Sequence, residues 1–148
     1  WDWAFEFLEQ YKAVLPPRDR ESAWQFNLAT YYFRKKDYER AQGILSRAEF
    51  RDVFYNLDAR RMLVRIYFDT DAVAALESLL DSCKTYLQRK RTVLGYHWAL
   101  NQNFVRFVKR LLQLEPGNAA ALEQLRTKIA ATGYVAEREW LLSHCAGA

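Results

Sequence analysis

The sequence predicts an all-helical protein that is built from stacked pairs of helices. Residues that favour helix dominate the chain of 148 residues, which contains only 5 glycines and 3 prolines. Similar residues recur at an interval of 35 positions in five pairs: Leu28 and Leu63, Tyr32 and Tyr67, Ala41 and Leu76, Leu45 and Leu80, and Ala48 and Cys83. A repeat of this length is typical of helix pairs that stack side by side, and not of one closed core.

The composition excludes several classes of protein. Hydrophobic residues make up 51% of the chain and aromatic residues 16%, which is enough for a packed core and excludes disordered and collagen-like chains. No apolar stretch approaches the ~20 residues that a membrane span requires. The two cysteines, Cys83 and Cys145, lack the spacing of a metal or redox motif and are interpreted as buried small side chains. A reducing compartment, and hence a cytoplasmic location, is favoured.

Apolar residues at steps of three and four positions predict the individual helices. The expected helices span residues 3–15, 21–35, 38–50, 55–68, 71–90, 93–114, 119–131 and 135–145. The third repeat unit is degenerate, since the aromatic position after Tyr67 falls on Gln102, and its first helix can be fused to its second. We therefore expect about seven helices in all.

Capping residues and turns set the expected boundaries of these helices. Pro16-Pro17 ends the first helix, because proline cannot continue a helix. Asp19 or Ser22 is expected to cap the second helix, and Asp37 the third. Residues of the same kinds mark the later boundaries: Asp52 or Asn56, Thr70 or Asp71, Pro116-Gly117-Asn118, and Thr132-Gly133.

The first full unit resembles the tetratricopeptide repeat. Its first helix has a large, a small and an aromatic residue at Leu28, Ala29 and Tyr32. Its second helix has a small, a large and a small residue at Ala41, Leu45 and Ala48. Small residues at these points let two helices cross closely. The second unit matches at Leu63, Tyr67 and Leu80, whereas Val64 and Leu76 are bulkier than the family pattern. The resemblance implies a right-handed α-solenoid of antiparallel helix pairs.

The same resemblance divides the chain, which we expect to be a single repeat domain over 1–148. Residues 1–17 would be the second helix of a truncated repeat, followed by full repeats at 21–53 and 55–91. Residues 92–148 would form a degenerate repeat and the helices that cap the stack. Because the chain opens in helix-like sequence without a methionine, we expect it to be a fragment of a longer protein.

In the tetratricopeptide family the first helix of each pair lines a concave face, which implies where a partner would bind. The candidate partner-binding residues are Phe26, Asn27, Thr30, Phe33, Arg34, Arg61, Arg65, Phe68, Tyr96 and Asn103. Aromatic rings supply apolar contact area, and arginines grip carboxylates with two hydrogen bonds. The sequence thus predicts a groove for an extended or helical peptide with acidic character. The alternative is that Phe26 and Phe33 pack against a neighbouring helix pair and that Arg61 pairs with a nearby acid.

Other chemistries find little support in the sequence. The basic clusters 34–36, 89–91 and 109–110 lie near expected helix ends, where cations complement the helix dipole, so we expect no nucleic-acid partner. His97 and His144 belong to no catalytic or metal-binding motif, and no glycine-rich phosphate loop is present. We therefore expect no enzyme activity, no cofactor and no metal site.

These observations favour a non-catalytic scaffold for protein–protein interaction, with a protein or peptide held on the concave face. Two alternatives stay open. The chain can be a structural spacer or a self-association module, in which the aromatic stripes are buried between copies as a homo-oligomer. It can also be the regulatory arm of a larger protein that has a DNA-binding or catalytic domain outside this sequence.

Overall fold

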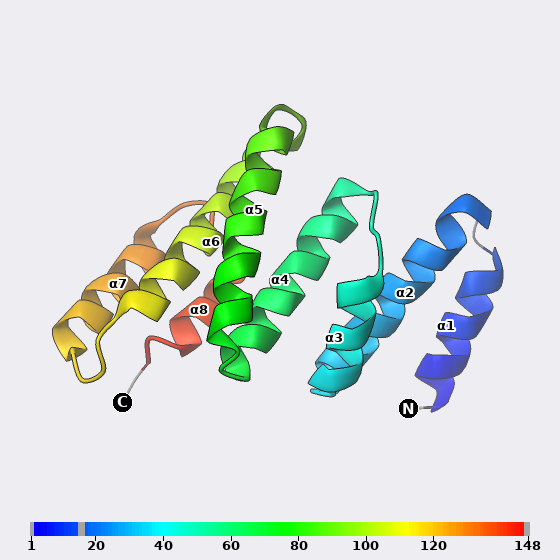
Figure 1. Ribbon diagram of the computed structural model, residues 1–148, viewed down its shortest axis with the longest axis horizontal. Coiled ribbons are helices and arrows are strands. Elements are labelled where there is room, and N and C mark those ends of the chain that lie inside the picture. The colour runs from blue at the N-terminus through cyan, green and yellow to red at the C-terminus, as the bar shows by residue number, and fades with distance from the viewer. Residues whose placement is uncertain (1, 15–16, 147–148) are drawn as a thin grey trace. The chain divides into compact units, whose positions relative to one another are not determined.

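The computed structural model describes residues 2–14 and 17–146 and is helical throughout (Figure 1). Within these residues there are eight helices and no strands: α1 Asp2–Val14, α2 Pro17–Arg34, α3 Tyr38–Arg47, α4 Val53–Asp69, α5 Val73–Leu94, α6 Tyr96–Gln113, α7 Ala119–Ala131 and α8 Arg138–Ser143. The all-helical class is confirmed, with one helix more than the expected seven. No helix in the described ranges is long and apolar enough to cross a membrane.

The chain divides into two compact units, which we call unit 1 (Trp1–Val73) and unit 2 (Ala74–Ala148). In unit 1, α2 contacts α1, α3 and α4, and α3 also contacts α4. In unit 2, α6, α7 and α8 contact one another. An ion pair of 3.4 Å between Lys109 Nζ and the Asp81 carboxylate links α6 to α5.

Small side chains bring the helices of unit 1 close together. Ala29 on α2 and Ala41 on α3 are completely buried, as the repeat pattern predicts for two positions at which helices cross. Leu45 on α3 and Val64 and Ile66 on α4 complete the buried apolar side of this unit. The core of unit 1 is therefore formed by facing stripes of α2, α3 and α4.

The core of unit 2 is centred on α6. Phe104, Phe107 and Val108 of this helix are almost entirely buried. Leu141 on α8 is also completely buried, and the ring of Trp140 lies 6.1 Å from the ring of Phe104. The short α8 thus packs its apolar side against α6.

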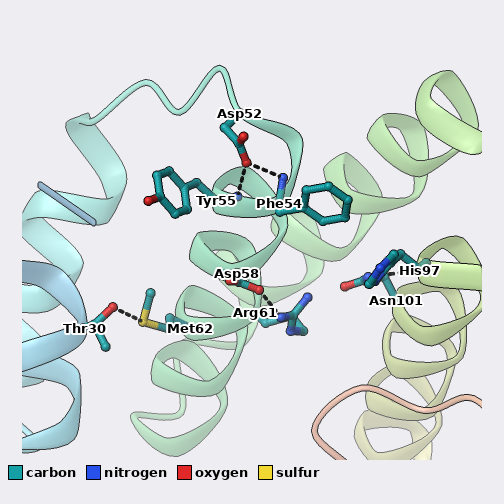
Figure 2. A network of polar contacts seen from close by, with 9 residues as sticks. All are labelled: Thr30, Asp52, Phe54, Tyr55, Asp58, Arg61, Met62, His97 and Asn101. Carbon is teal, nitrogen blue, oxygen red and sulfur yellow. Dashed lines mark hydrogen bonds and ion pairs between the residues drawn. The ribbon is translucent and has the colours of Figure 1, made fainter. Parts of the chain in front are cut away.

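Side-chain caps fix the start of three helices. Asp37 accepts a hydrogen bond of 3.3 Å from the Arg40 amide at α3, and Asn118 accepts one of 3.1 Å from Ala121 at α7. At α4, Asp52 accepts from the Phe54 amide at 2.9 Å and from the Tyr55 amide at 3.0 Å (Figure 2). The predicted caps Asp37 and Asp52, and the predicted turn at 116–118, are confirmed.

Other predicted boundaries were wrong. Helix α2 begins at Pro17, so Asp19 and Ser22 lie inside the helix and do not cap it. Proline fits the first helical turn because its fixed φ suits the helix and its missing N–H is not needed there. Thr70 ends α4 by donating its amide to Ile66, and Asp71 has a φ of 61°, so α5 starts only at Val73.

Two further boundaries depend on unusual backbone conformations. Gly95 separates α5 from α6 with a φ of 56°, a backbone conformation that residues other than glycine rarely adopt. Near the C-terminus, the Ala136 amide donates to the Leu100 carbonyl at 3.0 Å, and Glu137 has a φ of 58°. The segment from Val135 is therefore held against α6, and α8 starts at Arg138 instead of at Val135.

Candidate functional site

The candidate residues on α2 and α4 meet along the contact between these two helices in unit 1. The Thr30 hydroxyl donates to the Phe26 carbonyl at 2.9 Å and lies 4.0 Å from the Met62 sulfur (Figure 2). Thr30 is half-buried, and Met62 is buried. The first helices of the two expected repeats are thus direct neighbours at this point.

The ring of Phe26 packs within unit 1. It stacks on the ring of Tyr55 with a centroid distance of 4.6 Å and an interplanar angle of 15°. It also meets the ring of Phe50 edge-on at 6.0 Å. These contacts favour the alternative in which Phe26 packs between helix pairs. The side chain of Phe26 is nevertheless only half-buried.

Phe33 and Arg65 form a second link between α2 and α4. The guanidinium carbon of Arg65 lies 4.9 Å from the ring centroid of Phe33, which is a cation–π contact. The ring of Phe33 is also 5.8 Å from that of Tyr38. Burial raises the pKa of Tyr38, and the Asp69 carboxylate raises it further, whereas Arg65 opposes this shift. An arginine, a phenol and a carboxylate are thus gathered where α3 begins and α4 ends.

Arg61 forms an ion pair with Asp58, three positions earlier on the same helix (Figure 2). The side chain of Arg61 is 19% exposed, whereas that of Asp58 is 43% exposed. The neighbouring Arg60 donates to the amide oxygen of Asn56 at 2.7 Å. The charges at the start of α4 are therefore held by partners on α4 itself, which offset the unfavourable position of cations in the helix dipole.

The other candidates of unit 1 lie along the same two helices. Asn27 on α2 and Phe68 on α4 are half-buried. Arg34 is exposed in the last turn of α2, where its charge complements the helix dipole. Seven of the eight candidates in unit 1 are half-buried, so this face of α2 and α4 is neither fully closed nor fully open to solvent.

The two candidates on α6 belong to a separate cluster in unit 2. Tyr96 is 61% exposed and stacks on His97 with a centroid distance of 4.2 Å. Its ring also lies 6.1 Å from that of the exposed Tyr134. Asn103 donates from Nδ2 to the Tyr134 carbonyl at 2.7 Å and accepts from Arg106 at 2.9 Å. Asn103 therefore positions the loop that carries Tyr134.

Tyr134 is a member of this cluster that the sequence analysis missed. It follows Gly133 in the break between α7 and α8. An aromatic residue in such a connecting segment is a weak indication of a role at the surface. Another missed feature is an open hollow of about 730 Å³ between α2 and α3, which is lined by Tyr32, Arg40 and Arg47 among others. The guanidinium of Arg40 lies over the Tyr32 ring at 5.6 Å in this hollow.

The remaining reactive side chains are mostly buried and dispersed. Cys83 and Cys145 are buried free thiols, and burial raises the pKa of Cys145. His144 contacts the ring of Trp140 at 4.7 Å. In the described ranges, no group of three or more histidine, cysteine, aspartate or glutamate side chains is arranged to hold a metal ion.

Comparison of the chain with protein-family models, with curated proteins and with solved structures gave no match.

Proposed function

We propose that this chain is a non-catalytic scaffold, a right-handed α-solenoid of tetratricopeptide-like helix pairs that holds a peptide or a helix of another protein. The observation that supports it is the contact of α2 with both α3 and α4 in unit 1. Such a contact puts the first helices of successive pairs beside each other, so that their outward residues form one surface. Surfaces of this kind are how stacked helix pairs bind partners.

The chemistry of the α2–α4 face suits a peptide with apolar and acidic residues. Phe33 and Phe68 offer half-buried rings, which bury more apolar area when a ligand covers them. A guanidinium has five N–H donors and can bind a carboxylate through two parallel hydrogen bonds. A carboxylate of the partner would therefore share or replace Asp58 at Arg61, while Arg65 is held in place by Phe33.

Self-association is the second candidate function, and one observation favours it. Trp3 and Phe7 on α1 are 74% and 56% exposed, which is unusual for two large aromatic side chains one helical turn apart. A surface of this kind often marks a protein contact.

The scaffold function can be tested by selecting binders from a displayed library of random peptides against the immobilised chain. Affinities of the selected peptides would then be measured by fluorescence anisotropy for the parent, Arg61→Gln and Arg65→Gln. We expect selected peptides to be rich in aspartate or glutamate, and each substitution to weaken binding about tenfold or more, as for a buried arginine at an interface.

Arg40→Gln is the matched control, because Arg40 is exposed on α3 and lies outside the α2–α4 face. Circular dichroism and thermal melting would show that each variant is folded. The proposal fails if no peptide is selected, or if Arg61→Gln and Arg65→Gln bind the selected peptides as tightly as Arg40→Gln does.

A further inference from the structure

The positive charge of the chain is concentrated in one segment of unit 2. Residues 82–114 contain no aspartate or glutamate and carry seven basic side chains: Lys84, Arg89, Lys90, Arg91, Arg106, Lys109 and Arg110. The whole chain has a net charge of only +4, so the remainder of the chain is net acidic. A charge asymmetry of this size creates a local attraction for acidic surfaces.

One surface of this segment lies where α5 meets α6, at a site that we call the basic corner: Arg89, Lys90, Arg91, Val93 and Tyr96. Val93 and Tyr96 are 71% and 61% exposed, so the corner combines charge with accessible apolar area. The guanidinium of Arg91 lies 4.2 Å from the Trp98 ring. The guanidinium of Arg89 and the ammonium of Lys90 lie 5.8 and 6.0 Å from the Tyr86 ring. In the described residues these cations contact rings and not carboxylates, which leaves their donors available for an acidic partner.

Helix α1 presents the opposite chemistry. Trp3, Glu6, Phe7 and Gln10 recur at steps of three and four positions, so they share one side of the helix, and all four are exposed. We call these residues the acidic face. Its two aromatic side chains offer large apolar area, and Glu6 lies between them. Such a stripe is typical of an amphipathic helix that docks against a second apolar surface.

We propose that the acidic face of one copy of this chain docks on the basic corner of another copy. Trp3 and Phe7 would cover Val93 and Tyr96, and Glu6 would meet the guanidinium of Arg89. The two surfaces are complementary in charge, since Glu6 is negative and Arg89 is positive, and both offer exposed apolar side chains that would be buried on docking. This proposal rests on self-association, the second candidate function, and does not require peptide binding at the α2–α4 face.

The two surfaces differ, so the contact is heterologous: each copy has one acidic face and one basic corner. Contacts of this type join copies head to tail and continue as an open chain unless the geometry closes a ring. The average mass in solution should therefore rise steadily with protein concentration and fall with added salt, because salt screens exposed charges.

Sedimentation velocity of two complementary variants provides a direct test. Trp3→Lys/Glu6→Lys removes the acidic face, and Arg89→Glu/Val93→Glu removes the basic corner. All four positions are exposed, so both variants should fold, which circular dichroism would verify. We expect each variant alone to be monomeric. An equimolar mixture should form a dimer and nothing larger, because only one pair of intact surfaces remains.

Glu39→Lys and Lys84→Glu are matched controls, since both are exposed charge reversals outside the two surfaces. Each should associate as the parent does. A parent that stays monomeric at every concentration, or a mixture that stays monomeric, would overturn the proposal.

Binding of labelled single-stranded RNA and of anionic lipid vesicles distinguishes the other possible occupants. If the complementary variants form no dimer, and the parent binds either probe while Arg89→Glu/Val93→Glu does not, the basic corner serves a nucleic acid or a membrane and the self-docking proposal is wrong. If the dimer of complementary variants forms and neither probe binds, the corner is assigned to a second copy.

Discussion

The guanidinium of Arg138 closes the C-terminal end of α7. It donates to the carbonyls of Ile129 at 2.5 Å, of Thr132 at 2.6 Å and of Gly133 at 3.1 Å. The last carbonyls of a helix have no donor within the helix, and a positive charge is favourable at this end of the helix dipole. Because Arg138 is also the first residue of α8, one side chain fixes the angle between two helices.

We predict that Arg138→Met lowers the free energy of unfolding by about 2–3 kcal/mol, since it removes several hydrogen bonds from a charged donor. Arg138→Lys should recover only part of this loss, because an ammonium cannot span both groups of carbonyls. Urea denaturation followed by circular dichroism measures the free energy of unfolding of both variants. Arg126→Met removes an exposed pair with Glu123 and should leave the midpoint unchanged. An Arg138→Met variant as stable as the parent would contradict the capping role.

Tyr38 makes the stability of unit 1 sensitive to alkaline pH. Burial raises its pKa above the ordinary value of 10.0, the Asp69 carboxylate adds to this, and Arg65 opposes it. A raised pKa in the folded state means that folding favours the protonated phenol. The resulting stability is complete below the unfolded pKa and is lost as pH rises through the folded pKa.

We therefore predict a tyrosine that ionises above pH 10.0, visible at 295 nm in the absorbance difference between the parent and Tyr38→Phe. Asp69→Asn should move this midpoint downward, because the substitution removes a negative charge near the phenol. The alkaline loss of stability should also be smaller in Tyr38→Phe than in the parent. A midpoint at or below the ordinary value would show that neither partial burial nor the Asp69 carboxylate raises the pKa of Tyr38.

At the scale of the helices, residues that act locally could be predicted from the sequence. Asp37 and Asp52 cap helices through their own neighbouring amides, so a short stretch of sequence is enough to identify them. Pro17 was misread because proline both ends helices and starts them, and the sequence does not distinguish these roles. The late start of α8 depends on the bond from Ala136 to Leu100, which lies 36 residues earlier and has no local signal.

The junction of α5 and α6 depends on the backbone of Gly95. No atom lies within 4 Å of a Cβ added at this position, so only its φ of 56° would oppose a larger residue. We predict that Gly95→Ala lowers the free energy of unfolding by about 1–3 kcal/mol through backbone strain. Gly133 also has open space but lacks a positive φ, so Gly133→Ala should be neutral or slightly stabilising. Equal thermal midpoints for the two variants would contradict the strain argument.

For the whole molecule, the sequence shows which residues share one side of a helix, but it does not show which neighbours each of them contacts. The spacing of Phe26 and Phe33 marks one side of α2, but an aromatic ring packs equally well against a helix or a ligand. The partner of Arg61 was available in the sequence, since Asp58 lies three positions earlier on the same helix. The pairing of Tyr96 with Tyr134 could not be predicted from the sequence, because it depends on the path of a loop that is distant in sequence.

The division into two units predicts that the chain does not unfold in one step. Both cysteines lie in unit 2 and are buried, at 4% and 5% exposed, so a thiol reagent labels them only when this unit opens. Arg138→Met, in unit 2, should therefore accelerate labelling strongly. Asp52→Ala removes a cap in unit 1 at a cost of about 1 kcal/mol and should accelerate it little.

A chromogenic disulfide reagent labels the two cysteines and so measures the opening of unit 2. The loss of helical circular dichroism in urea measures the unfolding of the whole chain. Asp52→Ala should lower the urea concentration at which unit 1 loses its helical dichroism, while the rate of thiol labelling stays near that of the parent. If Asp52→Ala instead accelerates labelling in proportion to its loss of stability, opening of unit 2 requires opening of unit 1. The two units would then behave as one cooperative stack, because in repeat proteins the coupling between neighbours decides whether the chain opens in parts or as a whole.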